Sequence, residues 1–340
     1  MAPLRMLSGG LILLVFFVGY TIDLPKGIDG YTSAYFSPGN NDRYSSQLVD
    51  LLSRVPVKSI REGLVWTEWD RSQPQEKIEK QRAQLKLLRA KVDSILFMGG
   101  YSNEKFSSSR FEWCQLNSGY GRLNPKQSLE FLATKWGRFL KSSPLQAGDY
   151  FQVLNEMNTL KYFECIGGSN LEAYARILKV SSDILRERGV KIVTGGVILE
   201  GNYKEWLGHL TSSEVYKSYD VLALHPYCYP KVLSSHSFDG LTLKQIVLWI
   251  RALWAKQGLE SKPIWITEIG WPFHKGVENR PRLIQPAELK DRLQDLVLLK
   301  RDLDIERIYL YSLIDDEWYQ EDSSNEYFGL FDKHFKYKLQ

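Results

Sequence analysis

Short apolar runs alternate with longer amphipathic segments along most of the chain. Eight runs have the length and residue types of buried strands, and they lie at Ile28 to Tyr35, Val57 to Glu62, Ser94 to Gly99, Tyr150 to Asn155, Lys191 to Val197, Val221 to His225, Ile264 to Glu268 and Arg307 to Leu313. Helical periodicity is found between them, at Ser128 to Leu140, Leu171 to Arg188, Leu243 to Gln257 and Ala287 to Leu303. This alternation predicts an α/β fold with a parallel sheet.

The number of strands narrows the fold further. Eight strands separated by helices predict a single (β/α)8 TIM barrel over residues 25–340. A doubly wound sheet is the alternative, but it calls for a G-x-G-x-x-G turn after the first strand, and the sequence has none there. Few residues follow the eighth strand, and Tyr327 to Asp332 has the composition of a loop. The last helix of the barrel is therefore expected to be truncated or missing.

Residues 1–24 differ from the rest of the chain. No charge occurs from Met6 to Ile22, Arg5 precedes this stretch, and Leu11 to Val18 is its apolar centre. The pattern is typical of a secretory signal peptide. Val18 to Tyr20 matches a cleavage site poorly, so an uncleaved membrane anchor is the alternative. Both interpretations predict an exported protein, either periplasmic, extracellular or associated with the membrane through this segment.

Composition and charge exclude several classes of protein. With 44% hydrophobic and 25% charged residues the chain has an ordinary globular composition, which argues against disorder. Its 44 basic and 40 acidic residues are scattered, so no nucleic-acid partner is expected. Aromatic residues make up 13%, and rings of this kind suit a large core or a sugar-stacking surface. Several of them lie between Gly100 and Pro125, a candidate wall for a cleft.

Cysteine and histidine patterns give no sign of a cofactor. Cys114, Cys165 and Cys228 show no C-x-x-C spacing, the five histidines are dispersed, and neither H-E-x-x-H nor a phosphate-binding loop is present. We therefore predict no metal and no cofactor. In an oxidising compartment Cys114 and Cys165 could form a disulfide, and three buried thiols are the alternative.

Two glutamates stand at equivalent places in the predicted barrel. Asn155-Glu156 terminates the fourth strand, and Thr267-Glu268 lies at the end of the seventh. In a barrel of parallel strands, the carboxyl ends of all strands meet at one rim, which is where reactive groups gather. A single rim glutamate indicates little, but two of them predict chemistry that needs a pair of carboxyl groups.

The chain resembles a known family in the motifs at these strand ends. They are Asn155-Glu156 with Asn158 just beyond, His225-Pro226-Tyr227, Thr267-Glu268-Ile269-Gly270-Trp271, Ser59-Ile60-Arg61 with Trp66, and Thr194-Gly195-Gly196. In this order and placement they are similar to the clan A retaining glycoside hydrolases, and most similar to family 39. The resemblance covers nearly all of residues 25–340. Met157 stands where that family usually has proline.

The resemblance implies a double-displacement mechanism without a cofactor. Glu156 would be the acid/base and Glu268 the nucleophile, with their carboxyl groups about 5 to 5.5 Å apart. The two roles require Glu156 to be protonated and Glu268 to be anionic at the start of the reaction. Arg61 and Tyr227 would lie beside Glu268 as donors, although a structural ion pair is the alternative for Arg61.

The remaining candidates are expected to bind substrate. The resemblance implies that Asn155 contacts the sugar 2-hydroxyl, which strengthens in the transition state. His225 would contact substrate or orient a neighbouring group, and a buried core histidine is the alternative. Trp318, after the eighth strand, is the candidate floor for a sugar ring, with core packing as its alternative.

The expected function is hydrolysis of a glycosidic bond in an oligo- or polysaccharide. A catalytically inactive sugar-binding barrel, acting in polysaccharide assembly, is the main alternative, and transglycosylation is a third. The sequence does not define the sugar or the linkage, because the fold and the carboxylate pair serve many substrates.

Overall fold

The computed structural model describes residues 28–32, 49–52, 57–64, 75–99, 125–159, 169–273, 283–315, 327–332, 334 and 336–338. The predicted signal or anchor segment, the ring-rich segment 100–124, and Trp66, Cys114, Cys165 and Trp318 lie outside these ranges. Within them, no helix has both the length and the apolar character needed to cross a membrane.

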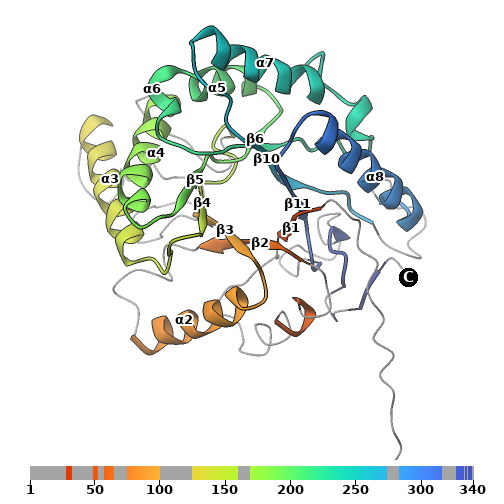
Figure 1. Cartoon of the computed structure of the whole chain (residues 1–340), viewed down its shortest axis with the longest axis horizontal. Coiled ribbons are helices and arrows are strands. Elements are labelled where there is room, and N and C mark those ends of the chain that lie inside the picture. Colours follow the sequence, from red (N-terminus) through yellow and green to blue (C-terminus); the bar gives the residue numbers. More distant parts are fainter. Residues whose placement is uncertain are drawn as a thin grey trace, which may run out of the picture.

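A nine-stranded parallel sheet forms the centre of the molecule. Its strands run in the order β5-β4-β3-β2-β1-β11-β10-β7-β6. Their bounds are β1 Gly30–Thr32, β2 Ser59–Leu64, β3 Ser94–Gly99, β4 Tyr150–Val153, β5 Lys191–Val193, β6 Val197–Ile198, β7 Leu222–His225, β10 Ile264–Ile269 and β11 Arg307–Tyr311. The sheet curls, and the helices lie around its outer side (Figure 1). The predicted α/β class with parallel strands is therefore confirmed.

The order of the strands brings the two ends of the sequence together. Strand β1 pairs with β2 on one side and with β11 on the other, so that Gly30 lies opposite both Ser59 and Tyr309. Across the sheet, a parallel bridge joins Val193 at the end of β5 to Val221 just before β7. The amide of Thr194 donates to the Val221 carbonyl at 3.0 Å. The sheet therefore curves far enough for the end of β5 to contact the residue that precedes β7.

Helices connect most of the strands, as the sequence pattern predicts. Their bounds are α2 Gln75–Arg89, α3 Pro125–Ser142, α4 Asn170–Arg186, α5 Tyr203–Leu210, α6 Ser213–Tyr216, α7 Leu243–Lys256 and α8 Pro286–Asp302. The four helices predicted from periodicity correspond to α3, α4, α7 and α8 within a few residues. Polar caps begin two of them, because the side chain of Ser169 accepts from Glu172 N and that of Thr242 from Gln245 N.

Alternation along the strands divides the apolar residues into two layers. Ile95 and Phe97 of β3 belong to the large core between the sheet and its helices, whereas Leu96 between them faces the other way. Leu96 packs in a second cluster with residues of neighbouring strands, namely Val193, Val221, Ala223, Trp265 and Tyr309. The inner face of the sheet is therefore packed by side chains from strands that are far apart in the sequence.

Several predicted boundaries were wrong in detail. Strand β4 ends at Val153, so Asn155 lies in the turn that follows it rather than in the strand. The predicted strand Lys191 to Val197 is broken into β5 and β6 by residues 194–196. A short antiparallel hairpin of β8 (Ser237–Phe238) and β9 (Leu241–Thr242) was not predicted.

No α-helix follows β11 in the described part of the chain. Instead, residues 327–332 run beside residues 312–315, with the Phe331 amide donating to Leu313 O at 3.0 Å and the Asp315 amide to Phe331 O at 2.8 Å. The Lys338 ammonium donates to Asp315 Oδ1 at 2.7 Å and to Tyr327 O at 3.1 Å, and it thus connects the two segments. This extended segment covers the end of β11, where the sequence left little room for a helix.

Candidate active site

Alternation places polar side chains on the inner face at the carboxyl ends of several strands. In β2, Ser59 and Arg61 point inward on either side of Ile60, which belongs to the helix-side core. Gln152 in β4 also points inward and accepts from Arg61 Nε at 3.1 Å. These side chains are almost completely buried, with Arg61 2% exposed. Arg61 and Gln152 thus form a buried polar contact on the inner face of β2 and β4.

An irregularity in β10 accounts for the position of Glu268. The register between β10 and β11 shifts between Ile266 and Ile269. Such bulges redirect side chains, because an extra residue interrupts the strict alternation of faces. As a result, both Thr267 and Glu268 make contacts with inner-face residues, Thr267 with His225 and Glu268 with Arg61.

Glu156 reaches the same place from the turn after β4. Its backbone φ is +42° and that of Leu154 is +66°, left-handed values that are uncommon for residues with a side chain. Two bonds to the Glu156 carbonyl brace the turn, from the amide of Thr159 at 2.9 Å and from its hydroxyl at 3.0 Å. The turn carries the Glu156 carboxylate to His225, at the end of β7.

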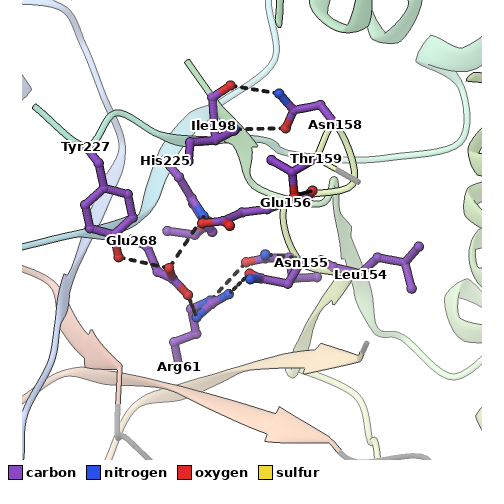
Figure 2. A network of polar contacts seen from close by, with 12 residues as sticks. Arg61, Leu154, Asn155, Glu156, Asn158, Thr159, Ile198, His225, Tyr227 and Glu268 are labelled. Carbon is purple, nitrogen blue, oxygen red and sulfur yellow. Dashed lines mark hydrogen bonds and ion pairs between the residues drawn. The ribbon is translucent and has the colours of Figure 1, made fainter. Parts of the chain in front are cut away.

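Arg61 is the centre of one half of the polar network (Figure 2). Its guanidinium donates through Nη1 to Glu268 Oε1, through Nη2 to Asn155 Oδ1 at 2.8 Å, and through Nε to Gln152. Tyr227 donates to the other Glu268 oxygen, Oε2, at 3.0 Å. Both oxygens of the buried Glu268 carboxylate thus have a donor, as a stable anion requires.

His225 is the centre of the other half. Its Nδ1 lies 3.0 Å from Glu156 Oε1 and 3.6 Å from Glu268 Oε2, while Nε2 lies 2.9 Å from Thr267 Oγ1. The ring is fully buried. It fits only because residue 196 is glycine, since a Cβ at Gly196 would lie 1.9 Å from His225 Nε2. Gly196 of the Thr194-Gly195-Gly196 motif therefore makes room for this imidazole.

The surroundings shift the pKa values of Glu268 and Tyr227 in opposite directions. Burial by itself would raise the pKa of Glu268, but the charge of Arg61, followed by His225 and the hydrogen bond from Tyr227, outweighs burial and leaves the pKa below its usual range. Burial, together with the charges of Glu268 and Glu156, raises the pKa of Tyr227 well above its usual value. Tyr227 therefore remains a proton donor, and Glu268 remains anionic at neutral pH.

The two carboxylates and the imidazole are close enough to act on one atom. One ligand atom from each of Glu156, His225 and Glu268 lies within 4.8 Å of the other two. This is the only such trio among the described residues, and its donor set could in principle hold a metal ion. However, the Arg61 guanidinium already occupies Glu268 and places a positive charge beside the trio. The arrangement suits acid/base and nucleophilic chemistry better than cation binding.

Six of the seven candidate residues from the sequence come together here. They are Arg61, Asn155, Glu156, His225, Tyr227 and Glu268, from the ends of β2, β4, β7 and β10 (Figure 2). Trp318 lies outside the described residues. Gln152 and Thr267 were not singled out, although both contact a candidate directly. Their inward position, two residues from another inner-face residue, is the signal that could have indicated them.

Sequence comparison does not place the chain in a family. No protein-family model matches it, and no curated protein matches it.

The fold, in contrast, is similar to those of many glycoside hydrolases. A family 39 glycoside hydrolase from Bacteroides cellulosilyticus has a TM-score of 0.59 at 15% identity, over 91% of this chain and 61% of that one. GH5_18 from Streptomyces cattleya, solved with GlcNAc, has a TM-score of 0.62 at 12% identity, over 92% of this chain and 78% of that one. A family 17 β-1,3-glucanosyltransferase from Rhizomucor miehei has a TM-score of 0.55 at 13% identity, over 93% and 97% respectively.

These similarities confirm the predicted resemblance to clan A glycoside hydrolases at the level of the fold. The chain spans about three-fifths of the length of the family 39 enzyme. At such low identity the comparison carries the architecture and not the individual residues.

Proposed function

We propose that the protein is a retaining glycosidase, with Glu156 as acid/base and Glu268 as nucleophile. One observation carries the proposal: two buried carboxylates approach each other to within 4.8 Å at the ends of β4 and β10, and they have different partners. Glu268 is bound by a cation and a phenol, which favour the anion, whereas Glu156 faces an imidazole that can exchange a proton. This spacing leaves no room for the water that an inverting mechanism places between substrate and base.

In the first step, Glu156 donates its proton to the glycosidic oxygen as the bond between that oxygen and the anomeric carbon breaks. A Glu268 carboxylate oxygen forms a bond to the anomeric carbon and gives a glycosyl ester. Arg61 and Tyr227 orient Glu268 for this attack. With its Oδ1 held by Arg61, Asn155 presents its amide NH₂ to the sugar 2-hydroxyl.

In the second step, the Glu156 carboxylate takes a proton from water as the water oxygen attacks the anomeric carbon. The ester bond breaks and the Glu268 carboxylate is regenerated, so that the configuration at the anomeric carbon is retained overall. The imidazole of His225 lies beside both carboxylates and orients the Glu156 carboxyl group.

The proposal includes closure of the curled sheet into a complete barrel. We take β5 and β6 as two parts of one interrupted strand, which gives a closed (β/α)8 barrel of eight strands. The bridge between Val193 and Val221 and the pairing of β1 with β11 support this closure. In such a barrel, both glutamates lie at the carboxyl-end rim, where substrate enters.

Transglycosylation is the second candidate, since a sugar hydroxyl can replace water in the second step. The Rhizomucor miehei neighbour is itself a glucanosyltransferase, so the fold accommodates either acceptor. An inactive sugar-binding barrel has less support, because it would have no need for two carboxylates in such close approach. Two nearby negative charges in a buried place are costly to maintain without a role.

The test is a screen of aryl β-glycosides and purified polysaccharides with the wild-type protein beside Glu268→Gln and Glu156→Gln. Loss of the nucleophile is expected to lower kcat by at least about 10⁴-fold. NMR of the first-formed product should show the anomer of the substrate. Equal slow turnover by wild type and Glu268→Gln would support the binding protein instead, and first formation of the opposite anomer would contradict retention.

The acceptor is identified in the same assay by product analysis at high oligosaccharide concentration. Products longer than the substrate would indicate transglycosylation. Products that are all shorter than the substrate would indicate hydrolysis. The predicted export of the chain remains a proposal, and detection of the full-length or processed protein in membrane and extracellular fractions tests it.

A further inference from the structure

The turn that carries Glu156 is held in an unfavourable conformation by contacts outside the acidic group itself. Leu154 and Glu156 both adopt positive φ, at +66° and +42°, and neither is glycine. Such backbone persists only when surrounding contacts determine it. The two bonds from Thr159 to the Glu156 carbonyl lie within the turn itself and do not attach it to β6.

Asn158 supplies a two-point attachment for this turn. Its side-chain Nδ2 donates to the carbonyl of Ile198 at 2.8 Å, and its Oδ1 accepts from the amide of Ile198 at 3.0 Å. The side chain thus pairs with β6 in the way that a neighbouring strand would. Strand β4 has already ended at Val153, so Asn158 continues the connection to the sheet where the backbone no longer provides it.

Ile198, to which Asn158 is bound, is adjacent to His225, the residue that contacts the Glu156 carboxylate. Ile198 lies opposite His225 in the register of β6 and β7, and His225 Nδ1 lies 3.0 Å from Glu156 Oε1. The contacts form a closed circuit from the Glu156 backbone through Asn158 to β6, across to His225 and back to the Glu156 carboxylate (Figure 2). A change at Asn158 therefore alters the distance between Glu156 and the residues that face it.

We propose that Asn158 is a positioning residue that holds the Glu156 carboxyl group where it can protonate the leaving group. This inference rests on the proposed glycosidase function. Asparagine is required because its amide offers a donor and an acceptor side by side, as the Ile198 backbone demands. Aspartate has the same shape but lacks the donor, and it would place a negative charge against the Ile198 carbonyl.

The chemistry of leaving groups separates positioning of the acid from general damage to the fold. A leaving group of low pKa departs without protonation, whereas one of high pKa needs the acid. The ratio kcat/KM reports the steps up to formation of the glycosyl ester, before Glu156 acts as a base. A displaced Glu156 should therefore slow poor leaving groups and spare good ones.

The experiment compares Asn158→Asp and Asn158→Ala with the wild type on 2,4-dinitrophenyl and 4-methoxyphenyl glycosides of the sugar that the aryl-glycoside screen identifies. We expect kcat/KM for the 4-methoxyphenyl substrate to fall at least about tenfold more than for the dinitrophenyl substrate. Ser181→Ala is the matched control, because it removes a buried hydrogen bond that Trp136 Nε1 donates to Ser181 Oγ, between α3 and α4 and outside this turn. The control should affect both substrates equally. Equal losses on both substrates in both Asn158 variants would overturn the proposal.

A crystal structure of each Asn158 variant adds a measurement that does not depend on turnover. We expect the Glu156 to His225 contact to be lost, and an unchanged contact would overturn the positioning role even if activity falls. If neither the wild type nor Glu268→Gln cleaves any substrate, the proposed glycosidase function is contradicted. The positioning role of Asn158 in that reaction is then contradicted as well. A wild type that is active, with Asn158 variants that slow both leaving groups alike, contradicts only the inference on Asn158.

Discussion

Two arginines lie on the sheet at opposite ends of its strands, and their surroundings differ. Arg61, near the carboxyl ends, binds the Glu268 carboxylate and two side-chain amide oxygens. Arg307, the first residue of β11, lies at the amino ends, where Ser94 and Tyr150 also begin their strands. An arginine therefore lies near each end of the strands of the sheet.

The partners of Arg307 are uncharged apart from one distant carboxylate. Its guanidinium donates to Ser94 Oγ at 2.8 Å and to Tyr150 OH at 3.2 Å. It stacks over the rings of Tyr150 and Trp265, at 4.7 and 4.6 Å from the ring centroids. The carboxylate of Glu306 is 3.9 Å away and 49% exposed, so water screens that pair.

The difference shows what each end of the sheet contributes. At the amino ends, a cation closes the core by stacking on rings and by neutral hydrogen bonds, a role that concerns stability. At the carboxyl ends, a cation binds a buried anion and lowers its pKa, as the proposed nucleophile requires. Substitutions of the two arginines should therefore separate stability from activity.

The largest effect is expected for Arg61→Met. Loss of the guanidinium removes the main influence that opposes the effect of burial on Glu268, so the pKa of Glu268 should rise. In the wild type, the lowered pKa means that the Glu268 anion, and the stability it contributes, are lost only as pH falls through that lowered value. In the variant, the acid limb of the profile of kcat/KM against pH should move upward, and activity at pH 7 should fall about 10²-fold or more.

A double variant sharpens this result. Arg61→Met should also lower the stability of the fold, because it leaves a buried carboxylate without its cation. Adding Glu268→Gln should restore part of the free energy of unfolding and none of the activity, as measured by denaturant titration and by turnover. If the double variant is no more stable than Arg61→Met alone, the ion pair is not the origin of the loss.

A smaller effect on the same carboxylate is expected for Tyr227→Phe. This variant removes one hydrogen bond to Glu268 Oε2 and leaves Arg61 in place. A hydrogen bond to a charged group contributes about 1.5 to 3 kcal/mol, so kcat should fall roughly 10- to 100-fold. The acid limb should shift upward by less than in Arg61→Met. An unchanged pH profile would show that Tyr227 does not influence the ionisation of Glu268.

The smallest effect on activity is expected for Arg307→Met at the other end of the strands. The substitution keeps an apolar contact with Trp265 but loses the bonds to Ser94 and Tyr150, so stability should fall by about 1 to 3 kcal/mol. Activity measured well below the Tm, and the acid limb, should stay unchanged within about twofold. A shifted acid limb would show that the two ends are coupled, and the contrast between the arginines would fail.

The strands could be predicted because each is a short apolar run with clear boundaries. Ser94–Gly99 agrees residue for residue, since β3 is buried from Ile95 to Gly99. The break in Lys191 to Val197 could not be predicted, because it depends on the space needed by His225, a residue of a later strand. Local pattern carries no information on such distant contacts.

The candidate site shows the same division. Glu156 and Glu268 could be predicted from their placement at strand ends, and the resemblance implied Arg61 and Tyr227 beside Glu268, where both lie. The contacts of Gln152, Thr267 and Asn158 could not be predicted, because they depend on register. The shift between Ile266 and Ile269 decides that Thr267 reaches His225, and the pairing of Ile198 with His225 gives Asn158 its importance.

The segment 327–332 extends the site beyond the strands that carry its reactive groups. The ring of Phe328 meets Tyr227 edge-on at 6.5 Å and Tyr311 at 5.4 Å between centroids. Arg61, Glu156, Tyr227 and Glu268 all precede this segment in the chain, so a ribosome synthesises every reactive group before the ring that packs against Tyr227. The ring contact of Tyr227 with Phe328 can therefore form only after residues 327–332 have been synthesised and have docked.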